Sequence, residues 1–99
     1  MKQEPVYPSF SKIRVWRCVH KIISELEKHE SCEYSAPLCN GWSIVGIKHS
    51  VTVKLMNVSI EYEFCLYNPD ECVQKSIGFG KLTRTNIRDT VKFMSSGKE

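Results

Sequence analysis

The chain has 99 residues, of which 41% are hydrophobic and 25% are charged, and its formal net charge at pH 7 is +3. A chain of this length builds one hydrophobic core, so a second domain is excluded and a large catalytic cleft is disfavoured. The mildly basic charge is by itself only weak support for an acidic partner, and the positions of the cations matter more than their sum.

The first segment of the chain gives no targeting signal. Residues 1–20 contain charged side chains and no continuous apolar run, so we expect neither a signal peptide nor a membrane span.

Pro5 and Pro8 predict an extended segment over residues 1–8, followed by a single domain over residues 9–97. Five cysteines without a secretory signal indicate reduced thiols. We therefore expect an intracellular protein that is cytoplasmic, with the membrane periphery and the nucleus as the alternatives.

A long amphipathic helix is predicted first, with Ser9 or Ser11 as its N-cap and its end near Glu30. Hydrophobic residues recur along it at steps of three and four, which is typical of a helix with one buried face. These residues are Ile13, Trp16, Val19, Ile22, Ile23 and Leu26.

The opposite face of this helix carries a basic stripe, formed by Arg14, Arg17, Lys21 and Lys28. The cations lie mostly in the N-terminal half and the glutamates at the C-terminal end, an arrangement that the helix dipole disfavours. Two interpretations stay open. The stripe is an ordinary solvated face with a weak ion pair between Lys21 and Glu25, or it binds an anion.

The middle of the chain predicts a sheet. Residues 31–41 contain proline, asparagine and glycine and are expected to form a loop. Residues 42–47 predict a first strand, and the alternating apolar positions of residues 51–55 and 58–66 predict a second and a third. The apolar parity changes between the last two, which indicates a tight turn or bulge at Met56-Asn57.

The last third predicts one more strand and a closing helix. Residues 68–71 are a turn signal, and residues 76–82 predict a fourth strand that two glycines weaken. The helix is expected to start near Thr85 or Asn86, with Asn86 and Asp89 as a pair resembling a capping box, and to reach Gly97. The fold class is therefore α+β, with an N-terminal amphipathic helix, three or four antiparallel strands and a C-terminal helix.

A second basic group surrounds the fourth strand and the start of the last helix. Gly78-Phe79-Gly80-Lys81 superficially resembles a phosphate-binding loop, but it lacks the required spacing and is not followed at once by a helix, so we interpret it as a glycine-containing strand. The members of this group are Lys75, Lys81, Arg84, Arg88 and Lys92.

The sequence gives only weak support for a metal site or a catalytic site. The cysteine pairs Cys32/Cys39 and Cys65/Cys72, even with His29 near the first pair, have wider spacing than most zinc sites. No local pattern brings a nucleophile, a histidine and an orienting acid together. We expect a non-enzymatic protein that uses neither a cofactor nor a metal.

Several short segments resemble kinase-associated-1 domains. The strand Ile60-Glu61-Tyr62-Glu63-Phe64-Cys65 is similar to an apolar-Glu-apolar-Glu-apolar-Cys strand of that family, and Cys32-Glu33-Tyr34 is similar to its segment after the first helix. Trp42-Ser43-Ile44 and the set Ile77, Lys81 and Leu82 also align. The chain departs from the family in lacking a Gly-Asp-aromatic segment before the last helix. The resemblance implies a regulatory domain that docks on anionic phospholipids.

Three functions stay open on these grounds. The first is docking on an acidic phospholipid surface, for which the candidate residues are Arg14, Arg17, Lys21, Lys75, Lys81, Arg84 and Arg88. The second is RNA binding through the same cations, as in a viral silencing suppressor, because the element order also resembles double-stranded-RNA-binding domains. The third is a protein interaction or homodimerisation surface anchored by Trp16, Trp42, Tyr62 and Tyr67.

Overall fold

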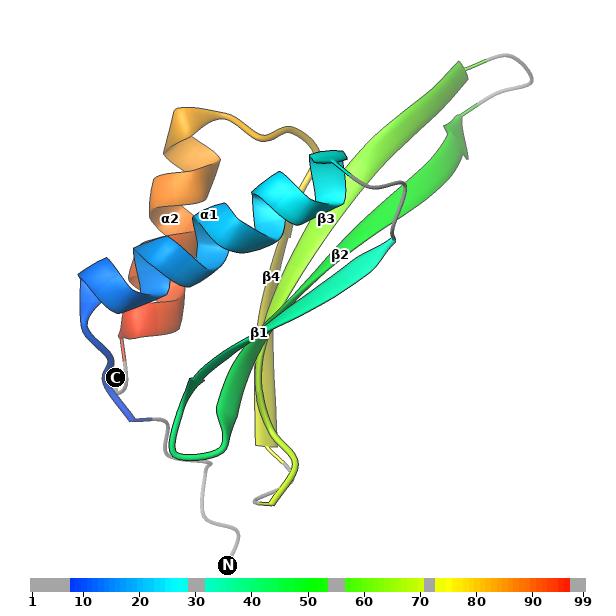
Figure 1. Cartoon of the computed structure of the whole chain (residues 1–99). Coiled ribbons are helices and arrows are strands. Elements are labelled where there is room, and N and C mark those ends of the chain that lie inside the picture. Colours follow the sequence, from blue (N-terminus) through cyan, green and yellow to red (C-terminus); the bar gives the residue numbers. More distant parts are fainter. Residues whose placement is uncertain (1–7, 29–31, 54–56, 71–72, 97–99) are drawn as a thin grey trace, which may run out of the picture.

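The computed structural model describes residues 8–28, 32–53, 57–70 and 73–96. The elements follow the order helix, four strands, helix, which confirms the predicted α+β class (Figure 1). The helices are α1 (Lys12–Lys28) and α2 (Arg84–Ser95). The strands are β1 (Glu33–Cys39), β2 (Trp42–Val53), β3 (Asn57–Asn68) and β4 (Val73–Phe79).

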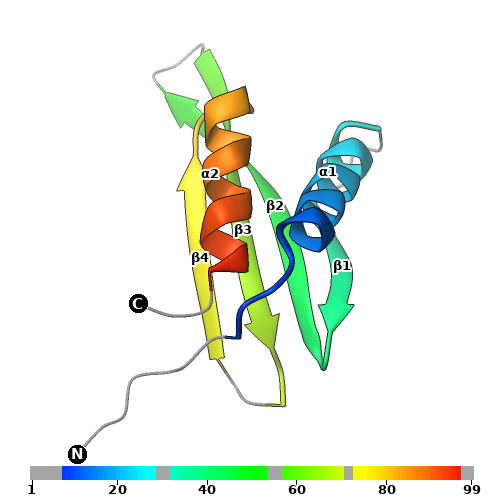
Figure 2. The same ribbon diagram turned by 90° about the vertical axis from the view of Figure 1, so that its left-hand side faces the viewer.

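The four strands form one antiparallel sheet in chain order, β1-β2-β3-β4. Both helices cover the same face of this sheet. Seen from the helix side, α1 lies over β1 and β2 and α2 lies over β3 and β4 (Figure 2). Among the described residues no helix lies on the opposite face, and β2 and β3 extend past the helices at one end (Figure 1).

The core lies between the helices and the covered face of the sheet. Its largest fully buried side chains are Phe64, Ile22, Leu26, Ile44, Leu66 and Met94. Gly46 pairs with Phe64 in the sheet, and a Cβ atom at Gly46 would lie 2.2 Å from Cγ2 of Ile22. The missing side chain at Gly46 therefore lets α1 approach β2 closely, which fixes the height of α1 above the sheet.

The loop predicted over residues 31–41 is wrong, because most of it forms β1. Pro37 had argued against a strand, but β1 is an edge strand, where a residue without an N–H group costs no interior hydrogen bond. The pairing shifts between Pro37 and Cys39, and the turn shrinks to Asn40 and Gly41. Their φ angles of 52° and 85° suit a two-residue hairpin turn, for which Asn-Gly is the preferred pair.

The two strands predicted over residues 42–47 and 51–55 are one strand, β2, since all the residues between them pair with β3. The predicted turn at Met56-Asn57 falls mostly on residues 54–56, which lie outside the described residues, while Asn57 already belongs to β3. The fourth strand begins and ends earlier than predicted, at Val73 and Phe79. The predicted turn before it includes an Asx turn, in which the backbone N of Asp70 donates to Oδ1 of Asn68 at 3.0 Å.

The helix ends also differ in detail from the prediction. The backbone N of Arg14 donates to Oγ of Ser11 at 3.5 Å, which makes Ser11 rather than Ser9 the capping residue of α1. The cap of α2 is Thr83, whose side chain accepts from the backbone N of Asn86 at 3.1 Å. The proposed Asn86/Asp89 pair is therefore not the cap, because the helix starts at Arg84, one or two residues earlier than expected.

Candidate anion-binding site

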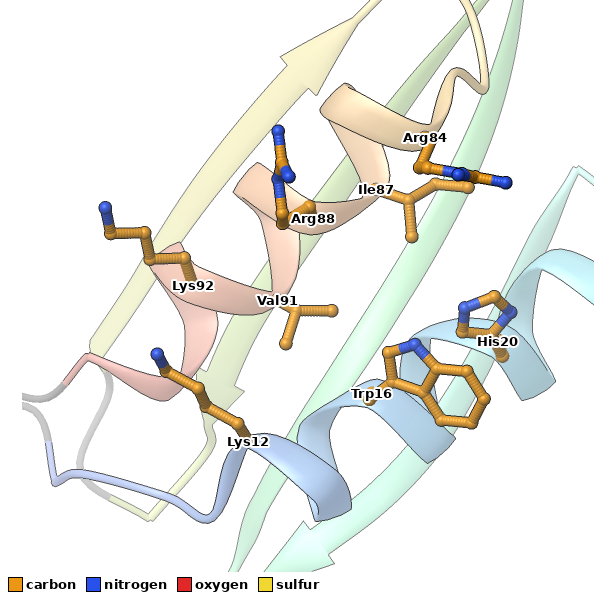
Figure 3. A pocket seen from close by; sticks show the side chains of 8 residues that line it. All are labelled: Lys12, Trp16, His20, Arg84, Ile87, Arg88, Val91 and Lys92. Atoms are coloured by element: carbon orange, nitrogen blue, oxygen red, sulfur yellow. The ribbon is translucent and has the colours of Figure 1, made fainter.

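A groove of about 750 Å³ runs between α1 and α2 on the side of the molecule away from the sheet (Figure 3). Three of its lining residues come from α1 and five from α2. They are Lys12, Trp16 and His20, and Arg84, Ile87, Arg88, Val91 and Lys92.

The spacing of these residues follows from helix geometry. Lys12, Trp16 and His20 are four residues apart on α1, and Arg84, Arg88 and Lys92 are four residues apart on α2, so each set forms one row along its helix. Ile87 and Val91 form a second row on α2, closer to the core. The row of Ile87 and Val91 faces α1, whereas the side chains of Arg88 and Lys92 extend away from α1 at the margin of the groove (Figure 3).

The middle of the groove is apolar. Ile87 and Val91 point from α2 toward α1, where Trp16 lies opposite them (Figure 3). Trp16 belongs to the apolar pattern of α1 and was also predicted as an interaction anchor. It is 52% exposed, and its ring lies against His20 with 4.1 Å between ring centroids. An exposed indole beside aliphatic side chains offers a surface for an apolar group of a ligand.

The margins of the groove are cationic. Four of the eight lining residues are lysine or arginine and none is aspartate or glutamate. Arg84 is the first residue of α2, and neither helix has an acidic residue in its first turn. Because the helix dipole already makes an N-terminus positive, this placement costs about 0.3–1 kcal/mol per charge and concentrates positive potential at the site.

The structure brings only part of the predicted cation set together. Arg84 and Arg88 line the groove, and Lys92 of the same predicted group joins them. Lys81 is exposed but lies outside the lining. Exposed cations of the α1 stripe also lie outside it, and among these Lys21 forms the expected ion pair with Glu25 at 3.6 Å. These stripe residues are Arg14, Arg17, Lys21 and Lys28.

Lys75 was wrongly grouped with the anion-binding residues, because its side chain holds the C-terminal end of α2. Its Nζ donates to the backbone carbonyls of Phe93 at 2.9 Å and Ser96 at 2.8 Å, and lies 4.7 Å from the centre of the Phe93 ring. Lys48 does the same for α1, donating to the carbonyl of Leu26 at 3.0 Å. Both lysines satisfy carbonyls that a helix end leaves without partners.

The four aromatic residues predicted to anchor a partner differ in their exposure. Trp16 and Tyr67 are exposed, at 52% and 39% respectively, whereas Trp42 is only 4% exposed and belongs to the core. Tyr62 is half-buried and stacks on Phe79 with 6.0 Å between ring centroids. Trp42 therefore does not anchor a partner in this structure. Its aromatic character alone did not indicate whether it packs inside or outside.

Sequence reasoning missed Lys12, His20, Ile87 and Val91 as lining residues. Lys12 and His20 stand one turn before and one turn after Trp16, so a search for residues four apart around that tryptophan would have grouped them. Their meeting with α2 depends on how the helices lie across the sheet. No local pattern in the sequence contains that information.

The open face of the sheet holds a group that superficially resembles catalytic machinery. Nε2 of His49 lies 3.1 Å from Oε1 of Glu63, and Sγ of Cys65 donates to Oε2 of the same carboxylate at 3.8 Å. Burial and the neighbouring Glu63 raise the pKa of the Cys65 thiol, which is the opposite of activating it. Ser50 is the next residue in β2 after His49, so its side chain points to the opposite face of the sheet and does not join His49 and Glu63.

Metal binding finds no support within the described part of the chain, where no group of three or more histidine, cysteine, aspartate and glutamate side chains is placed to hold an ion. His29 and Cys72 lie outside the described residues. The remaining cysteines, Cys18, Cys32, Cys39 and Cys65, are free thiols. Burial raises the pKa of the Cys18 thiol, with a smaller opposite effect of Arg14.

Comparisons with protein families, with curated proteins and with solved structures gave no match to this chain. Neither of the two described helices combines the length and the apolar character that a membrane crossing needs.

Proposed function

We propose that the protein is a non-catalytic module that docks on membranes rich in anionic phospholipid, with the α1–α2 groove facing the lipid. The observation that carries this proposal is the pairing of cations with exposed apolar side chains on one side of the molecule. Lys12, Arg84, Arg88 and Lys92 line the groove, while Trp16 and the nearby Ile13 are 52% and 65% exposed.

Each part of this surface suits a different layer of the membrane. Lysine and arginine near an anionic surface contribute about 1 kcal/mol each. Ile13 and Trp16 stand three residues apart on α1, and tryptophan is favoured at the level of the lipid head groups. Burying half of either side chain in the membrane contributes about 1 kcal/mol to the free energy of membrane binding.

The apolar part of the surface favours lipid over duplex RNA. Recognition of duplex RNA relies on phosphate and 2′-hydroxyl contacts, to which Ile13 and Trp16 add nothing. A lipid surface uses both the cations and the apolar side chains. The resemblance to kinase-associated-1 domains stays a prediction and implies the same ligand class, but the proposal rests on the groove.

The test is co-sedimentation of the purified protein with phosphatidylcholine vesicles that contain or lack phosphatidylserine. We expect binding only to the anionic vesicles, and weaker binding as salt shortens the screening length from about 30 Å at 0.01 M to about 8 Å at 0.15 M. A short RNA duplex is titrated in parallel. Tighter binding to the duplex than to the anionic vesicles would contradict the lipid proposal and would mean that the groove binds nucleic acid.

Two triple variants locate the binding surface. R84Q/R88Q/K92Q and R14Q/R17Q/K21Q each remove three positive charges, so both take the formal net charge from +3 to zero. The groove variant should lose roughly 100-fold in vesicle affinity, and the stripe variant less than about ten-fold. Equal losses would mean that net charge rather than the groove governs binding. Thermal unfolding of both variants controls for the fold.

A further inference from the structure

The groove has two chemically different ends. Arg84 lies at the end where His20 stands, and Lys12 extends from α1 toward the part of α2 that carries Lys92 (Figure 3). Arg88 is one helical turn from Arg84. The groove thus has a guanidinium end and a lysine end, with the apolar side chains between them.

Arginine and lysine make different contacts at such a site. A guanidinium is planar and binds phosphate oxygens through two parallel N–H donors. The side chains of Arg84 and Arg88 leave α2 in different directions (Figure 3), so a single phosphate group contacts both when they turn toward it. A lysine lays its four-carbon stem along apolar surface and keeps its ammonium group in water. The stems of the two lysines therefore continue the apolar surface of the groove, whereas the guanidinium groups of the two arginines end it.

The dimensions fit one narrow ligand. Arg84 and Lys92 lie eight residues apart on α2, which corresponds to about 12 Å along the helix. The groove volume of about 750 Å³ lies within the range of about 300–1,000 Å³ that small-molecule sites occupy. Trp16, Ile87 and Val91 offer the apolar contact along this length.

From this polarity we infer that the groove binds a single-chain amphiphile with a phosphate head group, taken up as a monomer. Its phosphate lies at Arg84 and Arg88, and its chain follows Trp16, Ile87 and Val91 toward the stems of Lys12 and Lys92. This inference rests on the proposed function, since it assigns the same groove to one lipid molecule. It adds the orientation of the ligand and the selectivity for phosphate.

Tryptophan fluorescence of the whole chain provides the assay, with decyl phosphate as the probe below the concentration at which it aggregates. Trp16 is 52% exposed and Trp42 is 4% exposed, so covering the groove should shift the emission of Trp16 to shorter wavelength and leave that of Trp42 unchanged. W16F removes the reporter and should abolish the shift. Decanol and inorganic phosphate, each tested alone at the same concentration, should give none.

Matched double variants test the orientation. R84Q/R88Q and K12Q/K92Q each take the formal net charge from +3 to +1. We expect R84Q/R88Q to weaken decyl phosphate binding by about ten-fold or more, and K12Q/K92Q by less than about three-fold. Equal weakening in both pairs would overturn the assigned orientation.

The outcome separates this inference from the proposed function. If decyl phosphate causes no saturable shift while anionic vesicles still sediment the protein, the monomer site is refuted and surface docking stands. If neither ligand binds, both proposals fail. A shift produced equally by decanol would refute the phosphate selectivity.

Discussion

Gly46 sets the distance between α1 and the sheet, and replacing it with alanine should destabilise the protein. The new Cβ would lie 2.2 Å from Cγ2 of Ile22, 3.3 Å from Cε2 of Phe64 and 3.4 Å from Cδ1 of Leu26. The first distance is well inside van der Waals contact, and Ile22 and Phe64 are fully buried. Neither side chain can move without disturbing the packed core.

The magnitude follows from two opposing effects. Forcing one extra carbon into a filled core costs typically about 1–3 kcal/mol. Removing the flexibility of glycine from the unfolded chain returns about 0.4–1 kcal/mol where the backbone suits alanine, as a strand position does. We therefore expect G46A to lower the free energy of unfolding by about 1–2 kcal/mol, a large share of the stability of a small domain.

Urea unfolding followed by circular dichroism measures this loss. G80A is the matched control, because a Cβ at Gly80 meets no atom within 4 Å, and its stability should equal or slightly exceed that of the wild type. The double variant I22L/G46A removes the Cγ2 methyl group and should recover part of the loss. A G46A protein as stable as the wild type, or an I22L/G46A protein with no recovery, would refute this account of helix placement.

Two further predictions concern single side chains. K75M should lower the free energy of unfolding by about 1.5–3 kcal/mol, because the ammonium group donates to two carbonyls at the end of α2, and K81M at an exposed position should change it little. An equal effect of both variants in urea unfolding would contradict the capping role. Alkylation by iodoacetamide at pH 8, followed by mass spectrometry, should modify exposed Cys32 before Cys18 and Cys65, whose pKa is raised by burial. Because the folded state keeps protons that the unfolded chain releases, these two thiols favour folding below about pH 8.5 and lose that contribution as the pH rises further.

The fold could be predicted where one periodic pattern ran long enough. The three- and four-residue steps from Val19 to Leu26 identified α1, and the alternation from Ile60 to Leu66 identified most of β3. β1 was missed because Pro37 reads as a loop residue unless the strand is known to lie at the edge of the sheet. Edge position is a property of the whole topology.

The site was predictable only as a list of cations. The sequence grouped Arg84, Arg88 and Lys92, which line the groove, but it also included Lys75, whose partners Phe93 and Ser96 lie 18 and 21 residues away. Contacts across such separations depend on the crossing of α2 over β4. Neither charge nor spacing distinguishes a lysine that caps a helix from one that faces a ligand.

The start of α1 gives the sharpest test of where periodicity fails. The repeating pattern placed Ile13 in the core, yet Ile13 is 65% exposed and Val15 is fully buried in its place. Val15→Ala removes two buried carbons and should cost about 1.5–3 kcal/mol, since each buried methylene is worth about 0.8 kcal/mol and a cavity remains.

Ile13→Ala should stay within about 0.5 kcal/mol of the wild type, because the residue is exposed and alanine is the better helix former. Anionic vesicle affinity should respond in the opposite order, falling for Ile13→Ala and holding for Val15→Ala at temperatures where that variant is folded. Urea unfolding and co-sedimentation of the two variants measure both quantities. A stability loss for Ile13→Ala as large as that for Val15→Ala would place Ile13 in the core, and with it would remove half of the apolar surface on which membrane docking depends.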